Sequence, residues 1–284
     1  MRSNLSATVI VRTWALGLAM ALLCVAVQAA NPADWWVDIA NDRVSNVKTM
    51  LAQGADPNEL SSKGQPAIMQ AIRDGAWGVY DVLAAHRKTS LNAININRET
   101  PLMYLAVLGE TKRAKDLIRR GAMVNRLGWT PLHYAASTGK LETARMLIAN
   151  KAIIDAPAPD GTTPLMMAAH SGSEAMVRLL LDHRAEVTTQ NLQKLDAADW
   201  AVNNKHVALA TMLETMIDKT LKQRATARQG ESQAPGSGSI APDIRPIDPP
   251  EIDAGATAPE RNVPQMKTDK PSSTSPYFDL ERFK

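Results

Sequence analysis

The chain has 284 residues and a formal net charge of +3, from 32 Lys and Arg against 29 Asp and Glu. This near-neutral balance lacks the strong basic character that proteins binding nucleic acid or anionic membrane carry. Both phenylalanines lie in the last seven residues, and the remaining apolar content is dominated by Leu, Ala, Ile, Val and Met, which favours packed helices over sheets.

Residues 1–30 are predicted to be an export signal. Arg2 and Arg12 supply positive charge, residues 14–27 form an apolar run, and small residues predict cleavage after Ala29 or Ala30. An uncleaved anchor is the alternative, but the run is shorter than the ~20 residues of a spanning helix. Lipid attachment at Cys24, the only cysteine, is a second alternative. We expect a periplasmic protein, or alternatively a secreted one, with no stable membrane span after cleavage.

A motif recurs through the middle of the chain. Thr-Pro-Leu begins at Thr100, Thr130 and Thr163, at intervals of 30 and 33 residues, and weaker copies begin at Pro66 and Asp196. Nine residues after each start come Gly75, Gly109, Gly139, Gly172 and Lys205, and 17 residues after it come Leu83, Leu117, Leu147, Leu180 and Leu213. Three markers in one register indicate a repeat array.

Each repeat is predicted to be a pair of helices. Threonine before proline is suited to the start of a helix, because the hydroxyl accepts a backbone N–H and proline needs no partner in the first turn. The glycine ends the first helix in the left-handed conformation. A second helix follows, for example at residues 173–182, with its apolar side chains at helical spacing. Such pairs bury their apolar faces by stacking on one another.

The array resembles the ankyrin-repeat family, whose Thr-Pro-Leu-His-x-Ala signature residues 130–135 match at every specified position. Together with the predicted export signal, the resemblance indicates an exported bacterial ankyrin-repeat protein. It implies an all-α solenoid of stacked helix pairs over residues 31–220, with an N-terminal cap and about five repeats. We expect Trp35 and Trp36 to cover the first pair. Distortion is expected near residues 87–98, where Arg98 replaces a glycine and where Asn95 and Asn97 support the turn because they tolerate unusual backbone angles, and near the shortened link at 125–129.

No catalytic motif is present in the sequence, and the five histidines are scattered along it. The family resemblance implies that His133 hydrogen-bonds the neighbouring turn. We therefore expect no catalytic residue, no metal and no cofactor. An enzyme with a metal site built from the histidines is kept as a weak alternative.

Ankyrin arrays bind folded proteins through loop tips, called fingers, and through their first helices. The residues that this implies here are, on the helices, Arg73, Asp74, Val107, Leu108, Ser137, Thr138, His170 and Ser171, and, on the fingers, Ile96, Asn97, Glu99, Arg126, Leu127, Trp129, Asp160 and Thr162. We expect a hot spot at the third and fourth repeats, because Trp129 and Arg126 are residue types that dominate interfaces. Alternatively, Trp129 packs against the shortened finger and is structural.

Residues 221–284 are predicted to be a disordered tail, since nine of the 17 prolines follow residue 221 and apolar residues are few. Residues 276–284 differ, because they hold three aromatic residues and a leucine. They are either a tethered recognition peptide, a random end, or a patch that folds back onto the array.

The sequence thus predicts an exported, monomeric binding module whose partner is a folded protein of unknown identity. Two further alternatives remain open. One is an inhibitor or immunity-type protein directed at a periplasmic enzyme. The other is an envelope scaffold that uses the array and the tail for different partners.

Overall fold

A computed structural model describes residues 31–231, with side chains as far as residue 228. These residues form twelve α-helices joined by short loops, in two compact units that divide between Ser90 and Leu91. The predicted export signal and residues 232–284 of the predicted tail lie outside the described residues.

The first unit is built from two helix pairs. Helices α2 (Trp35–Ala40) and α3 (Val44–Ala52) pack together, and α4 (Ala67–Arg73) and α5 (Trp77–Ala85) pack against α2 and α3 respectively. Trp35 and Ile39 on α2 are fully buried, whereas Trp36 is half-buried. Trp35 is therefore part of the core of the first unit, and the prediction that both tryptophans cover the first helix pair stays a prediction.

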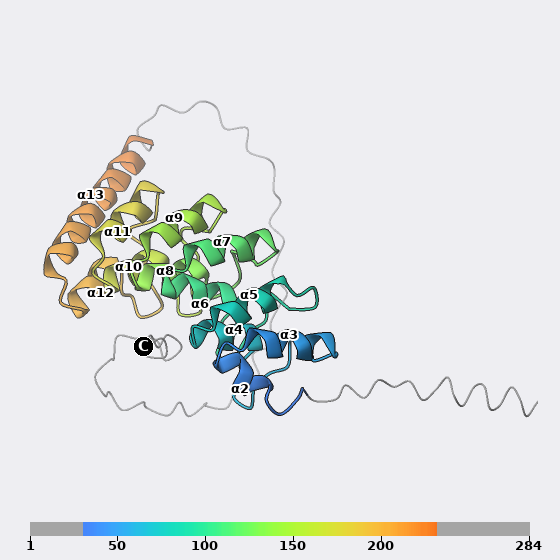
Figure 1. Cartoon of the computed structure of the whole chain (residues 1–284). Coiled ribbons are helices and arrows are strands. Elements are labelled where there is room, and N and C mark those ends of the chain that lie inside the picture. Colours follow the sequence, from blue (N-terminus) through green and yellow to red (C-terminus); the bar gives the residue numbers. More distant parts are fainter. Residues whose placement is uncertain (1–30, 232–284) are drawn as a thin grey trace, which may run out of the picture. The chain divides into compact units, whose positions relative to one another are not determined.

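The second unit holds four pairs in two layers (Figure 1). The first helices α6 (Pro101–Leu108), α8 (Pro131–Ser137), α10 (Pro164–His170) and α12 (Ala197–Asn203) pack on one another in succession. The second helices α7 (Thr111–Arg119), α9 (Leu141–Ala149) and α11 (Glu174–Asp182) do likewise, and α13 (Val207–Glu231) packs on α12. The predicted solenoid of stacked helix pairs is confirmed.

The motif prolines and glycines begin and end the first helices as predicted, but of the three motif threonines only Thr163 makes the predicted side-chain bond to its helix, and Thr100 and Thr130 do not. Thr130 precedes α8 in an extended conformation with proline at the first helical position, and Thr163 accepts a hydrogen bond from the Met166 N–H. Gly109 follows α6 in the left-handed region, with φ of 81°. Lys205 takes the corresponding place after α12 with φ of 65°, although it is not a glycine. An L-residue there is strained, so the last repeat tolerates a cost that glycine avoids elsewhere.

Three asparagine side chains each tie one repeat to the following one, and Asp155 takes this place at the next step by accepting the Glu186 N–H at 3.0 Å. Asn92 donates to the Gly121 carbonyl at 3.1 Å and accepts the Met123 N–H at 2.8 Å. Asn125 repeats the arrangement one step along, with the Lys151 carbonyl at 2.7 Å and the Ile153 N–H at 2.9 Å. Asn58 makes the same pair of bonds inside the first unit. One side chain thus satisfies two backbone groups of the following turn.

Replacing Asn125 with alanine is expected to lower the free energy of unfolding by about 1 kcal/mol, because both bonds are lost but the freed groups stay close to water. Denaturant unfolding measures this. The matched control is Asn203→Ala at the exposed end of α12, which should change the free energy by less than ~0.5 kcal/mol. An equal effect at both positions would contradict the bridging role of Asn125.

The array extends further than the sequence predicted. The predicted boundary at residue 220 is too early, because α13 continues to Glu231. Residues 221–229 contain neither proline nor glycine and are rich in Lys, Arg, Gln and Ala, which are good helix formers even on an exposed surface. Arg224 also pairs with Glu186 and donates to the Thr188 hydroxyl at 2.9 Å. Hydrogen bonds from Thr188 and Arg224 lower the pKa of Glu186 to about 2.

Candidate partner-binding surface

The fingers of the second unit are tight five-residue turns. In the finger at residues 95–99 the Asn95 N–H donates to the Glu99 carbonyl at 3.1 Å, and the fingers at 158–162 and 191–195 close in the same way, at 2.8 and 3.0 Å. The fourth residue of each has positive φ, and Arg98 occupies that place in the first of them. The Asn95 side chain accepts the N–H of Asn97 and of Glu99, so asparagine supports this turn through side-chain hydrogen bonds. The unusual backbone angle expected at Asn95 and Asn97 is instead at Arg98.

The finger at residues 125–129 is built differently. No backbone bond joins Asn125 to Trp129 in the described structure, and the Asn125 side chain is committed to the next repeat. Instead the Arg126 guanidinium reaches back and donates to the Arg98 carbonyl. The shorter link predicted from the sequence therefore leaves a finger that is held by its neighbour.

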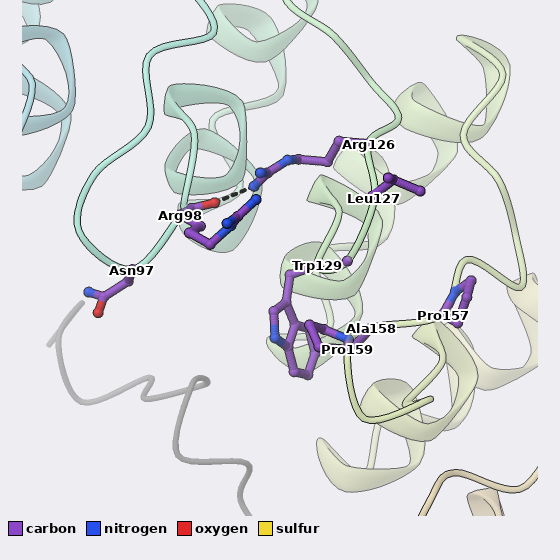
Figure 2. A pocket seen from close by; sticks show the side chains of 9 residues that line it. Asn97, Arg98, Arg126, Leu127, Trp129, Pro157, Ala158 and Pro159 are labelled. Atoms are coloured by element: carbon purple, nitrogen blue, oxygen red, sulfur yellow. Dashed lines mark hydrogen bonds between the residues drawn. The ribbon is translucent and has the colours of Figure 1, made fainter.

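A pocket of about 490 Å³ opens among three fingers, and we call it the finger pocket (Figure 2). Trp129, Ala158 and Pro159 are drawn on one side of it, and Arg98 and Arg126 on another. Its complete lining is Asn97, Arg98, Arg126, Leu127, Gly128, Trp129, Pro157, Ala158 and Pro159. The volume falls within the ~300–1,000 Å³ typical of ligand sites.

The finger pocket is cationic. Two arginines and no carboxylate line it, and within residues 31–231 neither Arg98 nor Arg126 forms an ion pair. Burial, and then the neighbouring charge of Arg98, lower the pKa of Arg126 from its usual value. Two guanidinium groups that repel each other in a partly desolvated place favour an anionic ligand.

Trp129 forms a wall rather than a protruding anchor. It is 8% exposed, and its ring meets His133 edge to face with centroids 5.1 Å apart. His133 in turn accepts the Thr130 N–H at Nδ1, and its Nε2 bonds to the Thr162 carbonyl of the next finger at 3.1 Å. This confirms the predicted role of His133. The low exposure of Trp129 agrees with a structural role at this position, and the ring that it meets belongs to His133 on α8.

Glu99 is not on the surface where the sequence placed it. It is 1% exposed, and its carboxylate accepts from the Tyr134 hydroxyl and from Asn95 Nδ2, both at 2.8 Å. The Tyr104 hydroxyl is a third donor, at 3.4 Å. Trp129 and Thr162 hold the same fifth position in the next two fingers and are also buried, whereas Leu195 in the finger at 191–195 is only partly buried.

Replacing Glu99 with alanine should lower the free energy of unfolding by about 2 kcal/mol, since buried hydroxyl and amide donors lose their acceptor. Tyr134→Phe removes a single donor and should cost about 1 kcal/mol. Chemical denaturation of the two variants measures both effects. A Glu99→Ala chain as stable as the parent would contradict this account.

The other predicted residues divide by exposure. Leu127 and Ile96 are 97% and 79% exposed, and Asn97 is exposed beside them. Buried residues, which we remove from the predicted surface, are Val107, Ser137 and Thr162. Partly exposed residues are Leu108, Arg126, Thr138, Asp160, His170 and Ser171, and exposed ones in the first unit are Arg73 and Asp74, which pair with each other. The Thr138 hydroxyl already donates its proton to the Val107 carbonyl at 3.0 Å, so it has no proton left to donate to a partner.

Sequence reasoning missed the proline wall. Pro157 and Pro159 are exposed and line the finger pocket together with Ala158. The sequence does contain a signal for this wall, namely two prolines within three residues at the start of the finger. Such a run is stiff and extended, so it presents its proline rings to solvent. Arg98 was noted only as a departure from glycine, and its place in the pocket followed from the fold.

In residues 31–231 no helix is long and apolar enough to cross a membrane. No group of three or more His, Cys, Asp or Glu side chains in the same part of the chain could hold a metal ion.

The comparison with known families agrees with this geometry. A family sequence model described as "Ankyrin repeats (3 copies)" matches residues 80–158, 106–191 and 148–223, which together span about half of the chain. The chain belongs to the ankyrin-repeat family. Ankyrin repeats are protein–protein interaction modules, so the fingers and the finger pocket are the part of this ankyrin array to consider for a partner.

Its ankyrin repeats are similar to those of much larger proteins. Neurogenic locus notch homolog protein 1 of Homo sapiens is 33% identical over 129 residues, and that of Mus musculus is 34% identical over 128 residues. Each match covers 44% of this chain and 5% of the relative. The chain thus matches a small part of these relatives.

Proposed function

We propose that this chain is an exported ankyrin-repeat binding module that holds a folded protein partner at the fingers of residues 95–99, 125–129 and 158–162. We further propose that it acts as a monomer, without catalysis, in the periplasm or outside the cell. Two exposed aliphatic side chains, Leu127 and Ile96, are on fingers that also contribute residues to the cationic finger pocket. The proline wall forms part of the same pocket. This combination is the observation that carries the proposal.

The finger surface has the composition of an interface centre. Isolated exposed aliphatic residues are ordinary, but Leu127 lines a pocket with tryptophan and proline rings, where an apolar side chain of a partner could exclude water. Arg98 and Arg126 supply charges that select an acidic partner and speed its association. Export is supported by residues 1–30, in which a positively charged start precedes an apolar run and small residues.

Site-directed photo-crosslinking tests the proposal. A photoreactive residue replaces Leu127 in one variant and Ile153 in a matched control, because Ile153 is also exposed but lies outside the finger pocket. In cell envelopes, position 127 should capture one protein reproducibly, and position 153 should not. Fractionation in the same cells should place the chain in the periplasm or the medium.

Three results would count against the proposal. Capture of the same proteins at both positions would contradict a finger site, and no capture at Leu127 would contradict a partner there. A chain retained in the cytoplasm would contradict export. If the captured protein is an enzyme that loses activity on binding, the inhibitor function replaces general binding.

A further inference from the structure

The finger pocket has a candidate ligand within the same chain. Residues 276–284 lie outside the described residues, and their sequence contains Tyr277, Phe278 and Phe283 with the carboxylates Asp279 and Glu281 among them. The 44 residues between α13 and this segment contain no aromatic residue at all. Aromatic side chains of the tail are therefore concentrated in this segment, where carboxylates lie beside them, and both chemistries complement a pocket that has apolar walls, two arginines and no carboxylate in its lining.

We propose that residues 276–284 dock into the finger pocket of their own chain and occupy the partner site in the absence of a partner. An aromatic ring of the segment packs against Trp129 and the proline wall, and Asp279 lies between Arg98 and Arg126. This inference goes beyond the proposed function, because it concerns what covers the site when no partner is bound.

The shape of the pocket favours such a ligand. Its apolar side is formed by Trp129, Ala158 and the prolines Pro157 and Pro159, and its open volume is about 490 Å³. Aromatic side chains fit such walls well, since a flat ring can pack on proline rings and meet the edge of an indole. Leu127 stands at the rim and can close over a ring that enters.

The charges are also complementary. The pocket carries two guanidinium groups and no carboxylate, and neither arginine is in an ion pair within residues 31–231. A carboxylate next to an aromatic residue, as in the Phe278–Asp279 pair, would satisfy both requirements in two consecutive residues. A planar guanidinium also binds a carboxylate in a bidentate manner, which fixes the direction of the segment.

The tether is long enough. A flexible chain of 44 residues has a typical end-to-end distance of roughly 35 Å, and Pro-rich stretches make it longer. Helix pairs in a stack are spaced by about 8–10 Å, so α8 lies roughly 20 Å from α12 and α13 across the stack. The tether starts at the end of α13, whose 25 residues add up to about 37 Å along the helix axis, so the span to the pocket is at most roughly 45 Å. Tethering at this length gives an effective concentration of the order of 1 mM, so that a segment with a Kd of about 0.1 mM would fill the pocket roughly ten to one.

Hydrogen exchange of the full chain tests the docking. The variant Tyr277→Ala/Phe278→Ala should exchange the amides of residues 127–129 about tenfold faster than the parent, as the occupancy ratio implies. The matched control is Ser272→Ala/Ser273→Ala in the same tail, which should leave these rates unchanged. Equal exchange in the parent and in the aromatic variant would overturn the proposal.

Charge reversal identifies the contact. Arg126→Glu and Asp279→Arg should each speed the exchange of residues 127–129, and the combination of the two should restore protection. Lys115→Glu, an exposed charge change on α7, is the control and should have no effect. Failure of the combined variant to restore protection would contradict the assigned pair. Protection that appears only at high protein concentration would overturn docking within one chain in favour of docking between two copies.

The docking of the tail segment and the binding of a partner can each fail without the other. If the segment docks, its aromatic variant should bind the protein captured at Leu127 about tenfold more tightly than the parent, because the competing occupant is gone. If the exchange rates do not change, the tail proposal fails while partner capture at Leu127 can still succeed.

Discussion

Replacing His133 with alanine is expected to lower the free energy of unfolding of the second unit by about 3 kcal/mol. The side chain is fully buried, and alanine would leave the Thr130 N–H and the Thr162 carbonyl without their partner. Each buried backbone group that loses its partner costs about 1–3 kcal/mol, and the vacated space beside Trp129 adds to this. Without the bond from His133 to Thr162, α8 is no longer tied to the next finger, and that finger forms one wall of the finger pocket.

Equilibrium unfolding in urea, followed by tryptophan fluorescence, measures the loss. His183→Ala is the control, because His183 is exposed at the end of α11 and should matter by less than ~0.5 kcal/mol. A His133→Ala chain that unfolds at the same urea concentration as the control would show that the bond to Thr162 does not hold the repeats together.

Stability should also fall as the pH is lowered through the range from 6.5 to 4. Burial lowers the pKa of His133 from 6.5 to about 4, so the unfolded chain binds a proton in this range while the folded chain does not. The contribution of neutral His133 to the free energy of unfolding is fully present above pH 6.5. The free energy of unfolding is lower by about 2 kcal/mol at pH 5 and by about 3 kcal/mol below pH 4.

The pH dependence can be assigned to His133 by comparing the parent with His133→Ala. The difference in free energy of unfolding, about 3 kcal/mol at pH 7.5, should shrink to about 1 kcal/mol at pH 5, because acid has already weakened the parent. Burial also lowers the pKa of His170, so that group adds a slope that both chains share. A difference that stays constant between pH 7.5 and pH 5 would contradict a neutral, buried His133.

The fold could be predicted from the sequence because the repeat signals are local. A threonine, a glycine and a leucine at fixed offsets specify where each helix begins, ends and packs, and the structure places them there. The end of α13 was missed for a physical reason. An exposed helix of good helix formers has no apolar period, so its composition looks like the beginning of a tail.

The surface was harder to predict, because exposure depends on the register of the finger. Ile96 and Leu127 are exposed, as their predicted use requires, but Glu99 was assigned to a surface that it does not reach. A charged residue is ordinarily exposed, and only the positions of Tyr104 and Tyr134 reveal that this carboxylate has buried donors. The finger pocket likewise depends on residues from three repeats, and no single repeat contains its pattern.

The central claim is that the fingers around the finger pocket bind the partner. It is tested most directly by the affinity of the protein captured at Leu127 for two matched double variants, Arg126→Glu/Leu127→Glu on the finger and Met123→Glu/Ile153→Glu on exposed turns outside the pocket. With folding verified, we predict that the finger variant binds at least about 30-fold more weakly, as loss of a hot spot of about 2 kcal/mol requires. The turn variant should bind within about twofold of the parent. Equal affinities for the two variants, or a loss confined to the turn variant, would contradict the claim.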